Sequence, residues 1–230
     1  MVKINSSIRN NHEKNIKNAY KKSISIYDEI LVGRKWWSKL YLTTFWGGIS
    51  DMDIAIELLN RIPKDFTGKI LDIPVGTGVF TSNYYKNLKN AILVGVDYSL
   101  DMLDKCRENM KHNSVLIELF QGDVGALEFE DASFDLLVSM NGFHAFPDKE
   151  KAYDTVLRVL KPGGRFLGCF YIKDQLRTGD FIVNNFLAPK GWFSPPFETK
   201  ESLLNRLSRD YELIWHVVNG SIISFECVKK

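Results

Sequence analysis

The sequence predicts an α/β protein with a Rossmann-like, seven-stranded sheet, in which five parallel strands are followed by a C-terminal antiparallel hairpin. Two patterns lead to this expectation. From Lys69 onward, short runs rich in β-branched residues alternate with helical segments. Such alternation is typical of βαβ units, which build a parallel sheet with helices on both faces. At the end of the chain, two strand-like runs flank Asn219–Gly220, a pair suited to a two-residue hairpin turn.

Each element can be placed by its residue range. The expected parallel strands are 69–73, 91–97, 115–121, 134–140 and 165–172. The expected helices between them are 79–88, 100–111 and 149–160, and the terminal hairpin pairs 211–218 with 221–228. Right-handed crossovers place the carboxyl ends of the parallel strands on one edge of the sheet, where ligands bind in this architecture.

The segment 1–66 is expected to form a helical cap or lid ahead of a main domain at 67–230. Apolar residues recur at helical spacing between positions 15 and 31, and a second helix starts near Ser50–Asp51 and ends at Pro63. Residues 1–22 carry six Lys or Arg against one acidic residue, which is typical of a solvated helix face. Within the main domain, 173–200 is expected to be an insertion.

The composition excludes several classes of protein. A formal net charge of +2 does not favour nucleic acid or an anionic membrane as an obligatory partner. No apolar run approaches the ~20 residues of a membrane span, and the polar N-terminus lacks a signal-peptide core. Three scattered cysteines indicate reduced thiols, and the histidines lack metal-ligand spacing. We therefore expect a cytoplasmic protein without a structural metal.

The turn after the first expected strand is glycine-rich. It reads Asp72-Ile73-Pro74-Val75-Gly76-Thr77-Gly78, with Thr81 where the third glycine of a dinucleotide-binding G-x-G-x-x-G would stand. Glycines here allow the backbone to approach a ligand closely. An acidic residue at the strand end suits the ammonium group of S-adenosylmethionine, which has no pyrophosphate but carries an amino-acid head and a positive sulfonium.

Acidic residues also follow the next two strands. Asp97 ends the second strand, nineteen residues after Gly78, and can accept both hydroxyls of a ribose. Ser99 can cap the following helix, while Tyr98 and Met102 are placed to line an adenine face. After the third strand, Gly122-Asp123-Val124 can accept an adenine amino group at Asp123; its other interpretation is a turn-initiating residue.

Two further motifs complete the pattern. The fourth strand leads into Ser139-Met140-Asn141-Gly142-Phe143-His144, and Lys161-Pro162-Gly163-Gly164 precedes the fifth. Together the motifs over about 70–168 resemble the small-molecule class I S-adenosylmethionine-dependent methyltransferases, especially the branch of the ubiquinone and menaquinone C-methyltransferases. Pro74 replaces the first glycine of that family's usual loop, which removes one N–H donor.

The resemblance implies S-adenosylmethionine as methyl donor and S-adenosylhomocysteine as product. The expected cofactor-binding residues are Asp72, Pro74, Gly76, Thr77, Gly78, Asp97, Tyr98, Ser99, Met102, Gly122, Asp123, Val124 and Asn141. His144 is the one candidate catalytic residue, as a general base, and a loop-holding role is the alternative.

The acceptor is expected to be a small, apolar or aromatic molecule that is methylated on carbon or oxygen. Aromatic stretches at 36–46 and 192–197 lie outside the motifs and can either line its pocket or pack against each other. This makes 173–200 an acceptor-side insertion. The candidate pocket residues are Tyr20, Tyr27, Trp46, Trp192 and Phe193.

Other functions remain open at this point. An RNA or protein methyltransferase is one alternative, although no N-P-P-Y type motif follows the fourth strand. A NAD-dependent oxidoreductase is a second, opposed by the missing third glycine and by the terminal hairpin. A third is a non-methylating protein that binds S-adenosylmethionine. The oligomeric state is not predicted.

Overall fold

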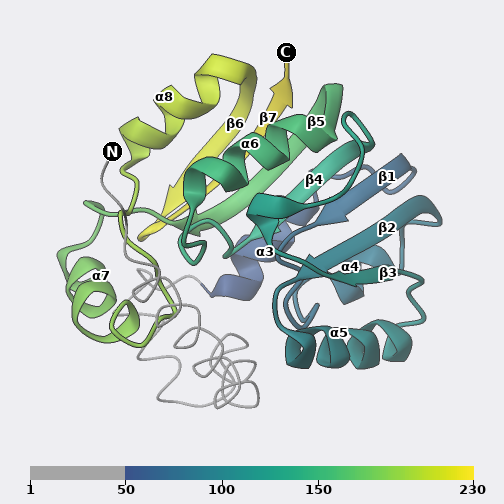
Figure 1. The fold of residues 1–230 in the computed structure, drawn as a ribbon, viewed down its shortest axis with the longest axis horizontal. Coiled ribbons are helices and arrows are strands. Elements are labelled where there is room, and N and C mark those ends of the chain that lie inside the picture. The colour runs from purple at the N-terminus through teal and green to yellow at the C-terminus, as the bar shows by residue number, and fades with distance from the viewer. Residues whose placement is uncertain (1–49) are drawn as a thin grey trace.

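The computed structural model describes residues 50–230, which contain one seven-stranded sheet (Figure 1). The strand order is β3-β2-β1-β4-β5-β7-β6. The strands are β1 (Thr67–Asp72), β2 (Asn90–Asp97), β3 (Glu118–Gln121), β4 (Phe134–Met140), β5 (Leu160–Tyr171), β6 (Tyr211–Asn219) and β7 (Ile222–Lys229). The helix predicted over 15–31 lies outside the described residues.

The pairing of the strands confirms the predicted topology. Strands β1 to β5 pair in parallel, while β7 runs antiparallel to both β5 and β6. Gly220 has a positive φ of 59° in the turn of the β6–β7 hairpin, a conformation that glycine adopts readily. The hairpin folds back so that β7, the last strand, is inserted between β5 and β6.

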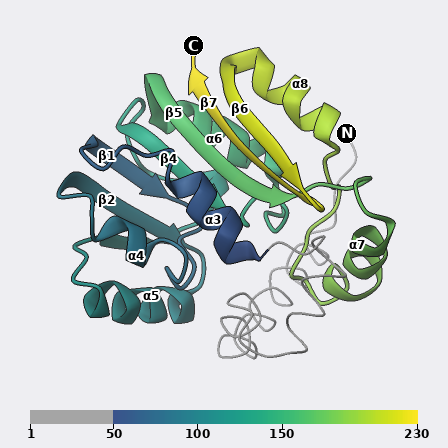
Figure 2. The same ribbon diagram turned by 180° about the vertical axis from the view of Figure 1, so that it is seen from behind.

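The helices form a layer on each face of the sheet. On one face lie α3 (Asp51–Leu59), α4 (Ser82–Tyr85) and α5 (Leu100–His112); in Figure 2, α3 crosses in front of the strands and α5 runs along the bottom of the view. On the other face lie α6 (Lys149–Val159), α8 (Lys200–Asp210) and the 3-10 turn η1 (Val124–Ala126). The two faces bury separate apolar clusters: Ile70 packs in the cluster that includes Leu58 of α3, and Leu71 packs in the one that includes Val156 of α6. Burial on both faces explains why the strands read as nearly continuous apolar runs.

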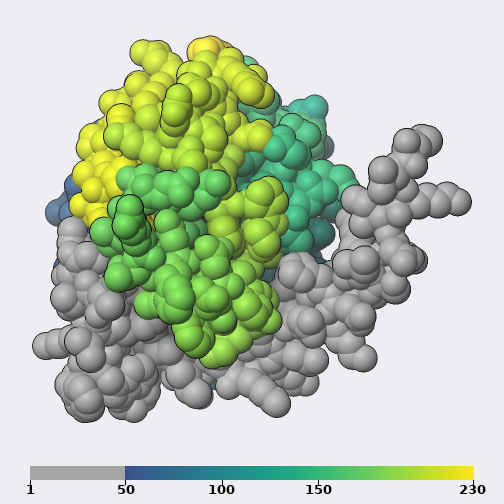
Figure 3. All heavy atoms as spheres, turned by 90° about the vertical axis from the view of Figure 1, so that its left-hand side faces the viewer, coloured from purple at the N-terminus to yellow at the C-terminus, as the bar shows by residue number. Residues whose placement is uncertain are grey.

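The segment predicted as an insertion contains a helix that the sequence patterns did not reveal. Residues Arg177–Ile182 form α7, which continues into a π-helical turn, η2, at Val183–Leu187. In the five-residue spacing of a π-helix, Phe181 and Phe186 lie close together, with ring centroids 6.2 Å apart, and both are exposed. Figure 3 shows this segment, in green, on the surface beside the yellow C-terminal elements.

Helix α3 belongs to the packed body of the sheet. Ser50 caps it as predicted, since its hydroxyl accepts a hydrogen bond from the backbone N–H of Asp53 at 3.1 Å. Its apolar side packs against β5 and β7, with Leu58 fully buried. The described end of the predicted cap segment 1–66 therefore shares a core with the main domain, and the division at residue 66 stays a prediction.

The chain reverses its direction across the sheet between β1 and β4. From β1 it proceeds outward to β2 and β3, and it then returns to add β4 on the other side of β1. At such a switch point the loops after the neighbouring strands diverge and leave a crevice at the carboxyl edge. Asp72 ends β1 and pairs in register with Val138 of β4 and Gly95 of β2, so the loops after these three strands meet there.

Within residues 50–230, no helix is long and apolar enough to cross a bilayer. The same residues contain no group of three or more His, Cys, Asp or Glu side chains that could hold a metal ion. Cys106, Cys169 and Cys227 are free and buried.

Candidate active site

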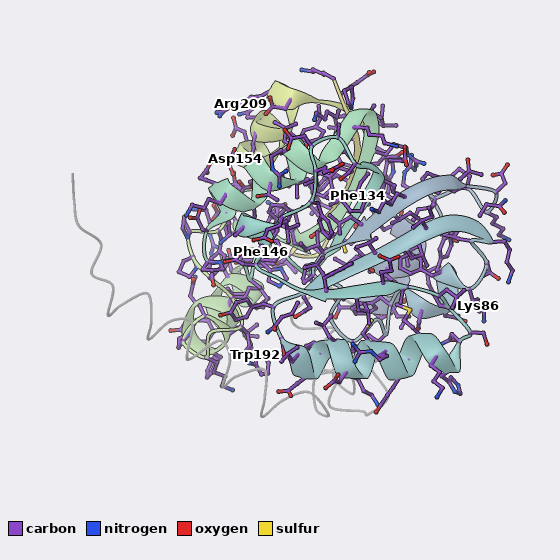
Figure 4. The ribbon with its side chains drawn as sticks, turned by 45° about the vertical axis from the view of Figure 1, so that its right-hand side comes forward. Lys86, Phe134, Phe146, Asp154, Trp192 and Arg209 are labelled. Carbon is purple, nitrogen blue, oxygen red and sulfur yellow. The ribbon has the colours of Figure 1, made fainter. Side chains whose placement is uncertain are left out.

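A cavity opens at the switch point, at the carboxyl ends of β1, β2 and β4. In Figure 4, Phe134 marks the start of β4 and Phe146 the loop beyond its end, and the cavity lies at the Phe146 end. Every residue that the sequence assigned to the cofactor borders this cavity. They are Asp72, Pro74, Gly76, Thr77, Gly78, Asp97, Tyr98, Ser99, Met102, Gly122, Asp123, Val124 and Asn141.

The glycine-rich turn is tied to β2 by its backbone. Val75 donates its N–H to the carbonyl of Val96 at 2.9 Å, and Gly78 donates to the carbonyl of Val75 at 3.0 Å. Gly78 has a φ of +69°, and a Cβ added there would lie 2.8 Å from Cε of Met110 in α5. A glycine is thus required at position 78 by the backbone conformation and by close packing.

Asp97 joins the turn to the start of α5. One carboxylate oxygen accepts the N–H of Gly76 at 2.9 Å, and the other accepts the N–H of Ser99 at 2.9 Å. The side chain is buried, and burial raises the pKa of Asp97 to about 6, against the opposing effect of these hydrogen bonds. The carboxylate keeps free lone pairs that can accept hydrogen bonds from a ligand.

Asp72 provides a second buried carboxylate. The hydroxyl of Tyr85 donates a hydrogen bond to it at 3.0 Å, and burial raises the pKa of Asp72 to about 7, against the smaller, opposite effect of this hydrogen bond. Among the described residues, no Lys or Arg pairs with Asp72 or with Asp97. This end of the cavity therefore suits a ligand that brings positive charge and hydrogen-bond donors.

The far end of the cavity carries Asp123 at a turn. Its carboxylate accepts the N–H of Gly125 at 2.8 Å and caps η1, so the turn-initiating role weighed from the sequence is present. The same residue borders the cavity with an exposed side chain. Met102 is buried at the start of α5, where Ser99 caps the helix by accepting the N–H of Met102 at 3.3 Å.

The loop after β4 packs directly onto the glycine-rich turn. Asn141 has a φ of +55°, and its N–H donates to the carbonyl of Cys169 at 2.7 Å. A Cβ added to Gly142 would lie 2.4 Å from Cδ of Pro74. A left-handed conformation is uncommon for residues other than glycine and persists only where the surroundings hold it. The packing of Gly142 against Pro74 therefore fixes the loop after β4 against the glycine-rich turn.

The apolar wall of the cavity was not predicted from the sequence. Most of its residues lie next to motif positions in the sequence, and this proximity is the signal that could have identified them. Two of them follow Gly78 directly, and three follow His144. The apolar lining residues are Ile73, Val75, Val79, Phe80, Val96, Met140, Ala145, Phe146 and Pro147.

His144, the candidate base, does not border this cavity. Its ring is stacked on Phe193 with centroids 4.0 Å apart, and its Nδ1 accepts the backbone N–H of Tyr171 at 3.1 Å. Burial lowers the pKa of His144 to about 3, with a smaller effect of Lys149. A buried, neutral imidazole that already accepts a backbone hydrogen bond holds the loop in place, which was the alternative interpretation of this residue.

The segment around Phe193 is clamped to the cavity wall. Ser194 donates its N–H to the carbonyl of His144 at 2.8 Å and its hydroxyl to the carbonyl of Ala145 at 2.9 Å. The Lys149 ammonium donates to the carbonyls of Phe146 and Ser194. These contacts connect consecutive residues of the cavity wall to the chain that follows α7.

The structure places the aromatic acceptor candidates away from the cavity lining. Phe193 is buried against His144 and Tyr171, and Trp192 is half-buried against the α3-side core. Neither residue borders the described cavity, and their place in an acceptor pocket stays a prediction. Tyr20, Tyr27 and Trp46 lie outside the described residues.

Comparison with known proteins shows what the motif region is similar to. Residues 70–164 match a family model described as a methyltransferase domain. The chain is 34% identical over 116 residues to demethylmenaquinone methyltransferase of Thermus thermophilus, covering 50% of each chain. It is 34% identical over 104 residues to fatty-acid O-methyltransferase of Mycolicibacterium smegmatis, covering 45% of this chain and 37% of that protein. The chain spans about half the length, or less, of the curated relatives it matches.

A solved structure extends the similarity over most of the chain. The S-adenosylmethionine-dependent methyltransferase of Thermotoga maritima, titled a possible histamine N-methyltransferase, superposes with a TM-score of 0.66 at 18% identity. The alignment covers 94% of this chain and all of that one. At this identity the likeness shows the fold, and it confirms the predicted architecture of a parallel sheet with a terminal hairpin.

Proposed function

We propose that this chain, which matches a methyltransferase domain model over residues 70–164 and shares the fold of a solved methyltransferase, is an S-adenosylmethionine-dependent methyltransferase acting on a small, apolar or aromatic molecule. One observation carries the proposal. The glycine-rich turn and two unpaired, buried carboxylates, those of Asp72 and Asp97, border one cavity at the switch point of the sheet.

The chemistry of these groups fits the methyl donor. Asp72 would hold the ammonium group of its amino-acid part, and Asp97 would accept hydrogen bonds from the ribose hydroxyls. Gly76, with a φ of +55° and open space where a Cβ would stand, lets the ligand approach the backbone. The adenine end would lie between Tyr98 and Asp123.

When bound, S-adenosylmethionine supplies a methyl group already activated by a positive sulfonium. The protein must then align an acceptor behind that methyl group and exclude water. Met140, Phe146 and Pro147 give the β4 side of the cavity an apolar wall that can do both. We propose that His144 holds the loop rather than acting as a base, since its ring is stacked on Phe193 and does not border the cavity.

The same cavity is unfavourable for a dinucleotide. A pyrophosphate at the turn after β1 would lie beside the unpaired carboxylate of Asp72 and be repelled by it. The antiparallel β7 also separates this sheet from the order 3-2-1-4-5-6 that is typical of dinucleotide-binding folds. Both observations disfavour the NAD-dependent alternative.

The apolar wall supports an apolar or aromatic acceptor, methylated on carbon or oxygen. Relatives named for a demethylated quinone and for fatty acids are consistent with such an acceptor. We propose that residues 1–66 and 173–200 complete the acceptor side, since Ser194 is already bonded to the cavity wall. The buried, free cysteines support a reducing compartment such as the cytoplasm.

Calorimetric titration of the full chain with S-adenosylmethionine, S-adenosylhomocysteine and NAD⁺ tests the proposal. The first two should bind and NAD⁺ should not. Asp97→Ala should weaken binding about 10- to 150-fold, the loss of about 1.5–3 kcal/mol expected for hydrogen bonds to a charged group. Asp101→Ala is the matched control, because Asp101 is exposed in the first turn of α5 and does not border the cavity.

Transfer of labelled methyl to a small-metabolite extract then tests the reaction itself. A product heavier by about 14 Da, one added CH₂, is expected in the small-molecule fraction. Binding of NAD⁺ in preference to S-adenosylhomocysteine, or label found only in RNA or protein, would contradict the proposal.

A further inference from the structure

Asp72, the carboxylate assigned to the ammonium group of the ligand, is itself held by a buried tyrosine. Tyr85 is the last residue of α4, and only 2% of it is exposed. Its hydroxyl donates a hydrogen bond to Oδ2 of Asp72 at 3.0 Å. Asp72 borders the cavity and Tyr85 does not, so any effect of this hydroxyl on a ligand must pass through the carboxylate.

The helix that carries Tyr85 is anchored to the glycine-rich turn of the same cavity. The N–H of Ser82 donates to the carbonyl of Gly78 at 2.9 Å, and the N–H of Tyr85 donates to the carbonyl of Thr81 at 2.8 Å. The ring of Tyr85 packs in the apolar cluster on the α3 side of the sheet. Because the backbone and the ring are both held, the hydroxyl is directed at Asp72.

The other titratable neighbours of Asp72 do not favour its ionised form. Burial raises the pKa of Asp72 most, and the Asp97 carboxyl raises it further, whereas the hydrogen bond from Tyr85 lowers it. The thiols of Cys106 and Cys169 stay neutral, because burial raises the pKa of each to about 12. Burial and the nearby Asp72 carboxylate also raise the pKa of the Tyr85 hydroxyl well above its usual range, so Tyr85 stays protonated and remains a donor.

We propose that Tyr85 is a positioning residue for the methyl donor, whose hydroxyl holds Asp72 as an ionised carboxylate and leaves its second oxygen to accept the ammonium group. The inference rests on the proposed function, in which Asp72 binds the amino-acid part of S-adenosylmethionine. A phenol favours the anion without neutralising it, because it donates a hydrogen bond but brings no charge. A Lys or Arg in its place would compete with the ligand for the same carboxylate.

Heteronuclear NMR of the carboxyl carbons measures the charge of Asp72 in the free protein. The wild-type carboxyl should titrate with a midpoint near pH 7. Tyr85→Phe should raise this midpoint by about one to two pH units, which is the effect of one hydrogen bond to a charged group. The matched control is Tyr84→Phe, because the hydroxyl of Tyr84 donates to the backbone carbonyl of Ile62 and does not border the cavity. It should leave the midpoint unchanged.

Calorimetric titration with S-adenosylhomocysteine measures the consequence for the ligand. At pH 5.5, where the carboxyl must lose a proton to bind, Tyr85→Phe should weaken binding about 10- to 100-fold, and Tyr84→Phe should not weaken it. At pH 7, Asp72 should release about half a proton on binding in the wild type and nearly a whole proton in Tyr85→Phe. In an Asp72→Asn background, Tyr85→Phe should cause no further loss of affinity.

An unchanged midpoint in folded Tyr85→Phe would overturn the inference, because Tyr85 would then only fill the core. A raised midpoint with unchanged affinity would overturn it as well, since the ligand would not depend on the charge of Asp72. If Tyr85→Phe does not fold, the wild type still decides: the Cζ signal of Tyr85 should titrate with the midpoint of Asp72, and a signal that does not move would overturn the inference. Failure of the wild type to bind S-adenosylhomocysteine would refute the proposed function, whatever the NMR midpoints.

Discussion

Cofactor affinity should depend steeply on pH, because two carboxyls in the cavity are held partly neutral by burial. The pKa of Asp72 is raised to about 7 and that of Asp97 to about 6, in both cases chiefly by burial. An ammonium group and ribose hydroxyls interact best with ionised carboxylates. Binding at low pH must therefore displace a proton from each carboxyl that has to ionise, and it should tighten as the pH rises.

The size of the effect follows from these values. At pH 5, a carboxyl with a pKa of about 7 is only about 1% ionised, and one with a pKa of about 6 is about 10% ionised. If only Asp72 must ionise, affinity should rise about 50-fold between pH 5 and 7, which is about 2.3 kcal/mol. If both must ionise, the rise should be about 500-fold, or about 3.7 kcal/mol. The range stops at pH 7 so that the amino group of the ligand stays protonated.

Stability of the free protein should change in the opposite direction. A carboxyl whose pKa is raised by folding stabilises the protein fully below its unfolded pKa of 3.8, and this contribution is lost as the pH rises through 6 to 7. Ligand binding offsets that loss. The shift in melting temperature caused by S-adenosylmethionine should consequently grow from pH 5 to pH 7.

Calorimetry in two buffers of different ionisation enthalpy measures both the affinity and the protons released. Near pH 5.5, between one and two protons should leave on binding, and Asp72→Asn should remove most of the pH dependence. If the affinity changes by less than twofold between pH 5 and 7 and no protons are released, the reasoning is refuted, because the carboxyls would then not titrate in the site.

Three substitutions test how the cavity wall is held. His144→Ala leaves the buried N–H of Tyr171 unpaired and should lower the free energy of unfolding by about 1–3 kcal/mol, as measured by urea denaturation. Cofactor affinity should not change. A variant of full stability that has lost turnover would contradict this. Gly142→Ala should weaken S-adenosylhomocysteine binding at least tenfold by calorimetry, because its Cβ would overlap Pro74, whereas Gly163→Ala, with open space around it, should leave binding unchanged. Lys149→Met should speed tryptic cleavage near α7 by removing bonds to the cavity wall, and unchanged cleavage would exclude the clamp.

The elements that the sequence predicts well are those with strong local periodicity. The predicted strand at 134–140 is β4 with the same bounds, and the helices predicted at 100–111 and 149–160 are α5 and α6 within one residue at each end. The helix predicted over 79–88 is only α4 at Ser82–Tyr85, because much of the remainder forms turns with 3-10 type bonds such as Asn87 N–H to the Tyr84 carbonyl at 3.0 Å.

Other differences arise where pairing with a neighbouring strand determines the bounds of a strand. The strand predicted at 115–121 shortens to β3 at Glu118–Gln121, an edge strand that can pair only with β2, and Leu116 is left 93% exposed. The strand predicted to begin at 165 instead starts at Leu160, which pairs with Phe134. No local pattern reveals which neighbour a strand edge will meet.

The same distinction explains why the sequence identifies the donor end of the cavity but not the acceptor end. Donor-side residues lie within a few positions of a strand end, so a strand, a turn and a helix start are enough to place Asp72 or Asp97. The acceptor-side wall depends on contacts between distant segments, since the Lys149 ammonium and the Ser194 carbonyl that it binds are 45 residues apart. Such contacts have no signature along the chain.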